Sequence, residues 1–361
     1  MQLKVLALNS SLRQDGESRT ELMLTHLVKG MRDAGAEVEV VNLREKEINY
    51  CMGCFSCDTI TPGQCIIQDD MSRELYPKWL ASDLCIYATP LFHWTMNAPM
   101  KAFIERTWPV MQPFFVKSDN GRWVHPPRHE SPKAVVLSVA GFSEDWIFAS
   151  LSNYANFLWG RNGKLVAEIY RPGAMFMTSL DPEKLADILG ATEQAGRELA
   201  MENRVLPETL ARAQQPVADL ETVAKAANMF WQTCIDEGVN PKAFNERIRI
   251  PRPHSLEDYL FLMQLAFSAK NAGDAKAIVQ FEFTGEVTGD CHIVVDNGKM
   301  QTNIGKAAQP NAIFRAPFEL WMDIASGKAN AIQMFMAGKC SAEGDLPLLM
   351  RMSQWFGLSP S

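Results

Sequence analysis

The fold is decided by the stretch Leu3-Lys4-Val5-Leu6-Ala7-Leu8-Asn9-Ser10-Ser11-Leu12-Arg13-Gln14-Asp15-Gly16-Glu17-Ser18-Arg19-Thr20. It opens with a short apolar run and continues into a loop rich in hydroxyl groups and arginines. Apolar residues at helical spacing follow, at Leu24, Leu27, Val28 and Met31. This order of strand, loop and helix predicts the start of an α/β domain.

The loop of this stretch is suited to a phosphate group, because a helix N-terminus presents unpaired N–H groups and a positive dipole end. It lacks the Gly-Lys-Ser/Thr ending of a Walker loop and the Gly-x-Gly-x-x-Gly of a dinucleotide loop. Hydroxyls and arginines without that glycine code suit a single phosphomonoester such as that of FMN. The alternative is a serine-rich loop that only caps the helix. The predicted phosphate ligands are Ser10, Ser11, Arg13, Ser18, Arg19 and Thr20.

Strand and helix patterns alternate along the first two thirds of the chain. Pro90 is expected to end the third strand, and residues 109–132 lack a clear period, which predicts a long functional loop. Five strands with helices between them predict a flavodoxin-like, doubly wound, parallel sheet. The predicted strands are 3–8, 37–43, 83–89, 133–140 and 164–170, and the predicted helices are 22–31, 71–81, 97–107, 143–158, 182–201 and 217–236.

The pattern changes after residue 238. Residues 239–254 contain stiff, turn-prone proline segments typical of a linker. A helix at 256–270 then precedes strands at 277–284, 292–295 and 300–304, with a hairpin turn at Asp296-Asn297-Gly298-Lys299 and further helical pattern to Phe356. We therefore predict a flavodoxin-like FMN-binding domain at 1–238, a linker at 239–254 and a smaller α+β domain at 255–361.

Composition limits the classes of partner. The chain has 361 residues, 47% of them apolar, and a net charge of −7, which argues against nucleic acid as the main partner. No apolar run reaches the length of a membrane span, and no export signal is evident, so we expect a cytoplasmic protein.

Four of the eight cysteines are clustered at Cys51, Cys54, Cys57 and Cys65. Thiolates at such short spacings hold iron–sulfur clusters, so these residues are the candidate metal ligands. Zinc is the second interpretation, a thioredoxin-like redox pair the third, and free thiols in a structural loop the remaining one.

Several separated motifs in the first 200 residues resemble the NADPH-dependent FMN reductase superfamily, in particular its iron–sulfur flavoproteins. They are Ser10–Thr20, the cysteine spacing, Gln68-Asp69-Asp70-Met71, Thr89-Pro90-Leu91-Phe92 and Lys101-Ala102-Phe103-Ile104-Glu105-Arg106. The resemblance implies FMN, a homodimer or tetramer, and a flavin ring that lies against Thr89, Pro90, Leu91, Phe92, His93, Trp94, Ala140 and Gly141. Asn9 departs from the glycine usual in relatives, and the 109–132 insertion is longer than expected, which leaves the substrate open.

Residues 255–361 resemble a sterol-carrier-protein domain. The resemblance is carried by three stretches, Phe281–Gly298, Phe318–Lys328 and Phe335–Asp345. It implies a curved sheet with helices over an apolar tunnel for a lipid or another apolar ligand.

Together these features predict an FMN-dependent oxidoreductase that takes electrons from NAD(P)H, or an electron-transfer flavoprotein, with a 4Fe-4S cluster as an additional centre. Its partners would be a small-molecule or protein electron acceptor and an apolar ligand. The sequence identifies no catalytic residue. The alternatives are a lipid carrier whose flavodoxin-like domain has lost redox activity, and a quinone or azo reductase without a cluster.

Overall fold

The structure, a computed structural model, describes residues 2–14, 16–118, 121–179 and 182–356. It divides into two compact units, Met1–Leu220 and Glu221–Ser361, here called the N-terminal and the C-terminal unit. The range 239–254, predicted as a linker, belongs to the C-terminal unit and contains helix α8 (Pro241–Arg247), which follows α7 (Leu220–Asp236). The functional domain boundaries at residues 238 and 255 stay a prediction.

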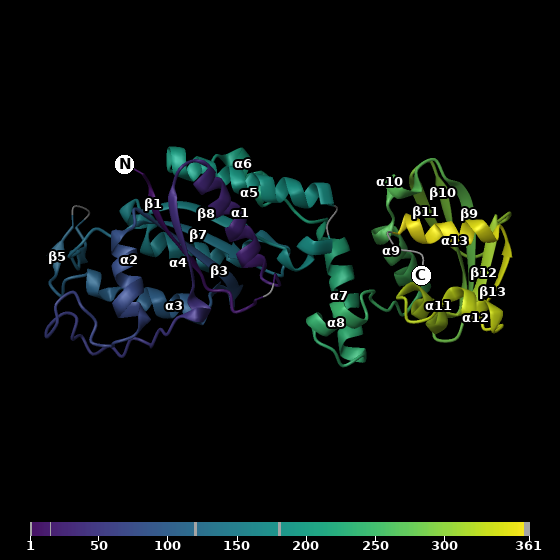
Figure 1. The fold of residues 1–361 in the computed structure, drawn as a ribbon, viewed down its shortest axis with the longest axis horizontal. Helices are drawn as coiled ribbons and strands as arrows, with labels where there is room; N and C mark the ends of the chain where they lie inside the picture. Colours follow the sequence, from purple (N-terminus) through teal and green to yellow (C-terminus); the bar gives the residue numbers. More distant parts are fainter. Residues whose placement is uncertain (1, 15, 119–120, 180–181, 357–361) are drawn as a thin grey trace. The chain divides into compact units, whose positions relative to one another are not determined.

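The N-terminal unit is built on a parallel sheet in the order β2-β1-β3-β7-β8. Figure 1 labels four of these strands, β1, β3, β7 and β8, with helices around them. Each neighbouring pair in this order is parallel. This is the strand order of doubly wound flavodoxin-like folds, so the predicted fold class is confirmed. The strands are β1 (Lys4–Asn9), β2 (Glu37–Asn42), β3 (Leu84–Phe92), β7 (Lys133–Val139) and β8 (Leu165–Arg171).

Both faces of this sheet are covered by helices, because alternate side chains of its central strands are apolar and buried. Val5, Ala7 and Ile86 face one helical layer, whereas Leu6 and Leu8 face the other. The first layer contains α1 (Arg19–Asp33), α5 (Pro182–Glu202) and α6 (Pro207–Ala213). The second contains α2 (Tyr76–Ala81), α3 (Ala98–Glu105) and α4 (Ala149–Leu158).

Helices α1 and α5 approach each other closely at two glycines. A Cβ atom on Gly30 would lie 1.8 Å from the carbonyl oxygen of Glu193, and one on Gly196 would lie 2.1 Å from that of Leu27. Any larger residue at either position would force the helices apart. The glycines therefore fix how α1, whose N-terminus follows the candidate phosphate loop, lies on the sheet.

The prediction that Pro90 ends the third strand is wrong. β3 continues to Phe92 and pairs with β4 (Thr95–Met96) in an antiparallel hairpin. β1 ends at Asn9, opposite Ala88, so the missing N–H of Pro90 interrupts no ladder on that side. The sheet can therefore extend past the proline.

Other segments differ in detail from the sequence pattern. The predicted helix at 71–81 begins as a π-helical turn (Met71–Leu75) before α2. The insertion 109–132 contains a short hairpin of β5 (Val116–Lys117) and β6 (Trp123–Val124). Helix α6 was not predicted from the sequence.

The C-terminal unit has its own five-stranded sheet in the order β11-β10-β9-β12-β13. The predicted hairpin is present, with Asn297 at φ 49° and Gly298 at φ 73° between β10 and β11. The assignment of the stretch after β11 to helices alone is wrong, because it also contains β12 and β13. The strands are β9 (Lys276–Thr284), β10 (Gly289–Asp296), β11 (Lys299–Ile304), β12 (Ala312–Pro317) and β13 (Ser341–Gly344).

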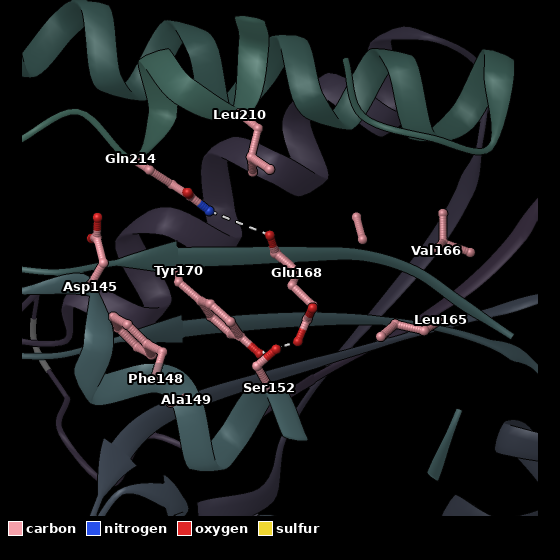
Figure 2. Close-up of a pocket in the computed structure, with 11 residues that line it drawn as sticks. Asp145, Phe148, Ala149, Ser152, Leu165, Val166, Glu168, Tyr170, Leu210 and Gln214 are labelled. Atoms are coloured by element: carbon pink, nitrogen blue, oxygen red, sulfur yellow. Dashed lines mark hydrogen bonds between the residues drawn. The ribbon is translucent and has the colours of Figure 1, made fainter. Parts of the chain in front are cut away.

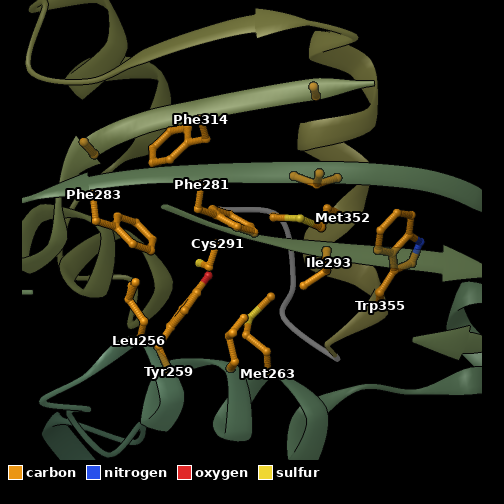
Figure 3. Packing of buried hydrophobic residues seen from close by; sticks show 14 of the residues in the cluster. Leu256, Tyr259, Met263, Phe281, Phe283, Cys291, Ile293, Phe314, Met352 and Trp355 are labelled. Atoms are coloured by element: carbon orange, nitrogen blue, oxygen red, sulfur yellow. The ribbon is translucent and has the colours of Figure 1, made fainter. Parts of the chain in front are cut away.

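One apolar core joins this sheet to its helices. Figure 3 shows Tyr259 and Met263 from a helix facing Phe281, Phe283 and other side chains of the sheet. The helices are α9 (Leu256–Ala266), α10 (Ala269–Ala272), α11 (Phe318–Ala325), α12 (Ala331–Met336) and α13 (Leu346–Trp355). Among the described residues of either unit, no helix is long and apolar enough to cross a membrane.

Candidate functional site

Three of the loops named by the sequence emerge side by side from the carboxyl edge of the parallel sheet. They follow β1, β3 and β7, which are neighbours in the strand order. Asn9 is opposite Ala88, and Pro90 is opposite Val139, so the three strands end at nearly the same level. Ligands of open α/β sheets bind beyond this edge, at the point where strand order reverses.

Hydroxyl groups in the loop between β1 and α1 stabilise the loop itself. The Ser10 hydroxyl donates to the Ala88 carbonyl oxygen at 3.1 Å, and the Ser18 hydroxyl accepts from the Glu21 N–H at 3.0 Å as the N-cap of α1. The capping role considered from the sequence is therefore real. Phosphate binding by these residues stays a prediction. The buried hydroxyl-bearing candidates are Ser10, Ser11, Ser18 and Thr20.

Two arginines place positive charge at this loop. Arg13 is exposed and Arg19 is half-buried at the first position of α1. Burial, together with the charge of Arg13, lowers the pKa of Arg19, while Glu17 opposes the shift. Two guanidinium groups close enough to repel each other make a surface that an anion would stabilise.

Two side chains that sequence reasoning missed hold the loop in place. Arg44, which lies in a short turn after β2 and is mostly buried, donates from Nη1 to the Ser11 carbonyl oxygen at 3.3 Å. Asn97 donates from Nδ2 to the Ser10 carbonyl oxygen at 2.6 Å and accepts from the Thr89 hydroxyl at 3.2 Å. The sequence predicted Asn97 as the first residue of a helix, whereas the structure has it as the N-cap of α3 (Ala98–Glu105). Nothing in the sequence indicates that either side chain reaches back to this loop.

The hairpin turn after β3 presents aromatic side chains to solvent. His93 (φ 47°) and Trp94 (φ 68°) both have left-handed backbones, which Asn and Gly normally supply in such turns. Phe92 and Trp94 are exposed, as are Phe142 and Trp146 after β7. The rings of Trp94 and Trp146 stack with centroids 5.8 Å apart. Strained residues that expose aromatic rings are typical of ligand sites.

The remaining candidates for contact with a flavin ring lie in the same region. Thr89 is fully buried, whereas Pro90 and Leu91 are half-buried along the end of β3. Ala140 is buried and Gly141 is exposed directly after β7. The structure thus brings the three groups of candidates to one edge of the sheet, although their contact with a flavin stays a prediction.

A separate cavity of about 560 Å³ lies beside the outer strand β8, between that strand, α4 and α6 (Figure 2). Its polar groups bond to one another: the Tyr170 hydroxyl donates to the Glu168 carboxylate at 2.6 Å, and Gln214 Nε2 donates to the Glu168 carbonyl oxygen at 3.4 Å. Burial and this carboxylate raise the pKa of Tyr170. None of the predicted site residues lines this cavity, so it is distinct from the candidate flavin site.

The four clustered cysteines surround one cavity of about 400 Å³ in the loop that follows β2. Gly53 (φ 64°) and Phe55 (φ 54°) turn the chain there, and Trp108 closes one wall while donating from Nε1 to the Asp58 carboxylate at 3.1 Å. The thiols share a cavity, but within the described ranges no three His, Cys, Asp or Glu side chains are arranged to hold a metal ion. The cavity is lined in part by Cys51, Cys54, Cys57 and Cys65.

The thiols of this cavity differ in acidity. Hydrogen bonds from Ser56 lower the pKa of the exposed Cys54. Burial, then the negative charges of Asp58 and Cys65, raise the pKa of Cys57 to about 11. The raised pKa favours the neutral thiol of Cys57 at pH 7, whereas a bound metal cation would favour its thiolate.

Comparison with known proteins matches the two units to different families. Residues 3–121 match the family model described as NADPH-dependent FMN reductase, and residues 264–357 match the SCP-2 sterol transfer family. An iron–sulfur flavoprotein of Archaeoglobus fulgidus is 36% identical over 107 residues, which cover 30% of this chain and 46% of the relative. An iron–sulfur flavoprotein of Methanocaldococcus jannaschii is 29% identical over 119 residues, covering 33% of this chain and 59% of the relative.

The chain spans about half the length of these curated relatives. Among solved structures, the NAD(P)H:quinone oxidoreductase of Methanothermobacter marburgensis aligns with a TM-score of 0.42 at 20% identity, covering 55% of this chain and 96% of that one. An azoreductase of Bacillus anthracis aligns with a TM-score of 0.41 at 15% identity, covering 55% and 98%. The N-terminal region of this chain is thus similar to the NADPH-dependent FMN reductase family, and its C-terminal region is similar to the SCP-2 sterol transfer family.

Proposed function

We propose that this protein is an FMN-dependent oxidoreductase that takes electrons from NAD(P)H and delivers them to a small-molecule or protein acceptor. The observation that supports this most is the convergence of the loops after β1, β3 and β7 at one sheet edge, with an arginine pair at one end and exposed aromatic rings at the other. The match to the FMN reductase family agrees with it.

The residues at this edge suit FMN in two ways. Arg13 and Arg19 supply the positive charge that a phosphomonoester requires, next to the N-terminus of α1. Backbone groups of the turn around His93 can bond the edge of a flavin ring, and Phe92 or Trp94 can cover its face. When bound, FMN supplies the redox chemistry, and the protein binds and orients it.

We propose further that the four cysteines hold a 4Fe-4S cluster, which when bound would supply one-electron transfer between flavin and partner. Their common cavity and the names of the matched relatives support this. Zinc, a redox-active dithiol and free thiols are the other interpretations. Iron and sulfide analysis of anaerobically purified protein separates them, because a 4Fe-4S cluster requires about four irons for each chain.

The C-terminal unit is proposed to bind an apolar ligand, in keeping with its family match. Inside its core, Trp321 Nε1 lies close enough to the Tyr259 hydroxyl to oppose the rise that burial causes in the pKa of Tyr259, yet the two groups do not reach hydrogen-bond geometry, and neither has another partner among the described residues. Buried donors without partners are costly unless a ligand or water satisfies them. These two buried donors favour an apolar ligand that carries a hydrogen-bond acceptor. They also support the alternative function, a carrier protein for such a ligand.

An absorption spectrum of freshly isolated full-length protein, followed by addition of NADPH and of NADH, tests the proposed activity. Flavin bands that bleach with a nicotinamide donor and return with a quinone acceptor are expected. Colourless protein that binds no added FMN would contradict the proposal and favour the carrier. The homodimer or tetramer and the cytoplasmic location stay predictions.

A further inference from the structure

The cavity of the four cysteines has one cationic wall. Of the described residues that line it, Arg106 alone carries a positive charge, and Glu105 carries a negative one at the more exposed side. Arg106 follows α3, far along the chain from the cysteine loop. An anionic centre held by four thiolates would therefore lie against a guanidinium group that is part of the folded core.

Arg106 is fixed by its outer nitrogens. Its side chain is 1% exposed, and it forms a two-fold ion pair with Asp69, from Nη1 at 2.7 Å and from Nη2 at 3.0 Å. Nη1 also donates to the Asn49 carbonyl oxygen at 2.7 Å, and Nη2 to the Ser72 hydroxyl at 2.9 Å. These partners leave the guanidinium with almost no freedom to move.

The inner nitrogen of Arg106, Nε, lacks the hydrogen bonds that the two outer nitrogens make: it is buried and has no hydrogen-bond partner in the described part of the chain. Burial alone would lower the pKa of Arg106, but Asp69 and then the neighbouring Cys65 outweigh it and raise that pKa. A buried N–H without a partner is costly, and this one belongs to a side chain that forms the wall of the cysteine cavity.

We propose that Arg106 is a positioning residue that sets the reduction potential of the centre bound by the cysteines, by stabilising its reduced state electrostatically. The inference rests on the proposed iron–sulfur function. Uptake of one electron adds one negative charge to a thiolate-bound cluster, with no bond formed or broken and no proton required. A fixed positive charge beside the thiolates favours that added charge and raises the potential.

Asp69 does not cancel this effect, because of its position. It bonds the outer nitrogens of Arg106 and does not line the cavity. The positive charge is therefore closer to the cysteines than the negative one, and Coulomb energy falls with distance. Removing the charge of Arg106 should consequently lower the reduction potential, whereas removing the charge of Asp69 should raise it.

The test is a potentiometric titration, monitored by EPR, of anaerobically purified full-length protein. At a fixed potential, Arg106→Met should lower the ratio of reduced to oxidised centre at least tenfold. For a one-electron couple this corresponds to a reduction potential at least 59 mV lower. Asp69→Asn should shift the ratio toward the reduced state, and Arg106→Lys should lie closer to the wild type than Arg106→Met. Loosening of the loop alone would move the first two variants in the same direction, and that result would overturn the inference.

Two further results complete the test. If neither variant of the buried pair folds, the reduction potential of Glu105→Gln tests the electrostatic role instead. Glu105 lines the cavity, and because its carboxylate is exposed and paired with Lys101, the substitution should not prevent folding. A shift toward the reduced state supports the electrostatic role, and an unchanged potential overturns it. Wild-type protein without iron would instead overturn the proposed cluster itself, so the two failures are distinguishable.

Discussion

Asn97 donates from Nδ2 to the Ser10 carbonyl oxygen at 2.6 Å, and this buried contact joins two loops that are 87 residues apart in the sequence. The same amide accepts from the Thr89 hydroxyl at 3.2 Å. One side chain thus fixes the phosphate-loop candidate relative to the strand that carries the ring-contact candidates. The geometry of the proposed flavin site depends on it.

Replacing Asn97 by Ala should therefore weaken both the fold and FMN binding. The Ser10 carbonyl would lose its partner, which costs about 1–3 kcal/mol of unfolding free energy. Urea unfolding and quenching of FMN fluorescence measure the two effects. Asn156→Ala is the control: this exposed side chain donates to the Ser152 carbonyl oxygen within α4, and its loss should change stability by no more than about 0.5 kcal/mol. Equal effects of the two substitutions would contradict the assigned role.

Arg13→Ala should lower FMN affinity about tenfold without changing stability, because an exposed arginine contributes a charge-assisted bond to phosphate rather than core packing. Equilibrium dialysis with FMN checks this, with riboflavin as a second ligand. The loss should be absent for riboflavin, which has no phosphate. Arg204→Ala, an exposed arginine paired with Glu202 at the far end of α5, is the matched control. Unchanged FMN affinity in Arg13→Ala would count against the loop assignment.

For the hairpin turn after β3, we predict that one double substitution raises the stability of the protein but lowers its affinity for flavin. Replacing His93 by Asn and Trp94 by Gly gives the residues that its left-handed backbone prefers, and should relieve strain of about 1–2 kcal/mol for each residue. The same change removes the exposed Trp94 ring, so flavin affinity should fall. Thermal unfolding of the FMN-free protein and FMN titration measure the two quantities. A double variant that binds FMN as well as the wild type would show that Trp94 does not contact the ring.

The buried pair of Asp69 and Arg106 predicts a specific acid sensitivity. Burial alone would raise the pKa of Asp69, but bonds from Arg106, Asn49 and Ser72 outweigh it and bring that pKa below 3.8. A lowered pKa in the folded state gives stability that is complete above pH 3.8 and is lost as the pH falls further. Asp69→Asn should cost about 3–5 kcal/mol at pH 7 and clearly less at pH 3. Urea unfolding at both values checks this, and an equal cost at both would contradict it.

In the C-terminal unit, Tyr259→Phe should leave stability nearly unchanged but weaken ligand binding. Apart from the nearby Trp321 Nε1, the hydroxyl has no polar partner among the described residues, so its removal takes away a poorly satisfied buried group. Displacement of a fluorescent fatty acid measures the affinity. Tyr76→Phe in the N-terminal unit, whose hydroxyl is likewise buried without a partner, should not alter that affinity. An unchanged affinity in Tyr259→Phe would exclude this hydroxyl as the polar contact.

Local patterns were sufficient to predict most of the parallel sheet. Buried strands such as β1 and β7 are continuous apolar runs, and Ser18 marks the start of α1 as an N-cap should. Pro90 misled the prediction because a proline interrupts a strand only where its N–H is needed, and that depends on where the neighbouring strand ends. In the C-terminal unit, β12 pairs with β9 over a long separation, which no local period reveals.

In the candidate site, too, some residues could be predicted from the sequence and others only from the structure. Residue types and loop positions pointed to Arg13, Arg19 and the cysteines, because their chemistry is visible in the sequence. Arg44, Asn97 and the inner face of Arg106 could not be found in that way. Each acts on a segment distant in sequence, and only tertiary packing brings their side chains there.

The most direct test of the central proposal is a crystal structure of the full-length protein with FMN. We predict the phosphate within hydrogen-bonding distance of Arg13 or Arg19 and the ring across the ends of β1, β3 and β7, against the turn at His93 and Trp94. FMN bound elsewhere, for example in the cavity beside β8, or a β1–α1 loop without contact to the phosphate, would contradict the account.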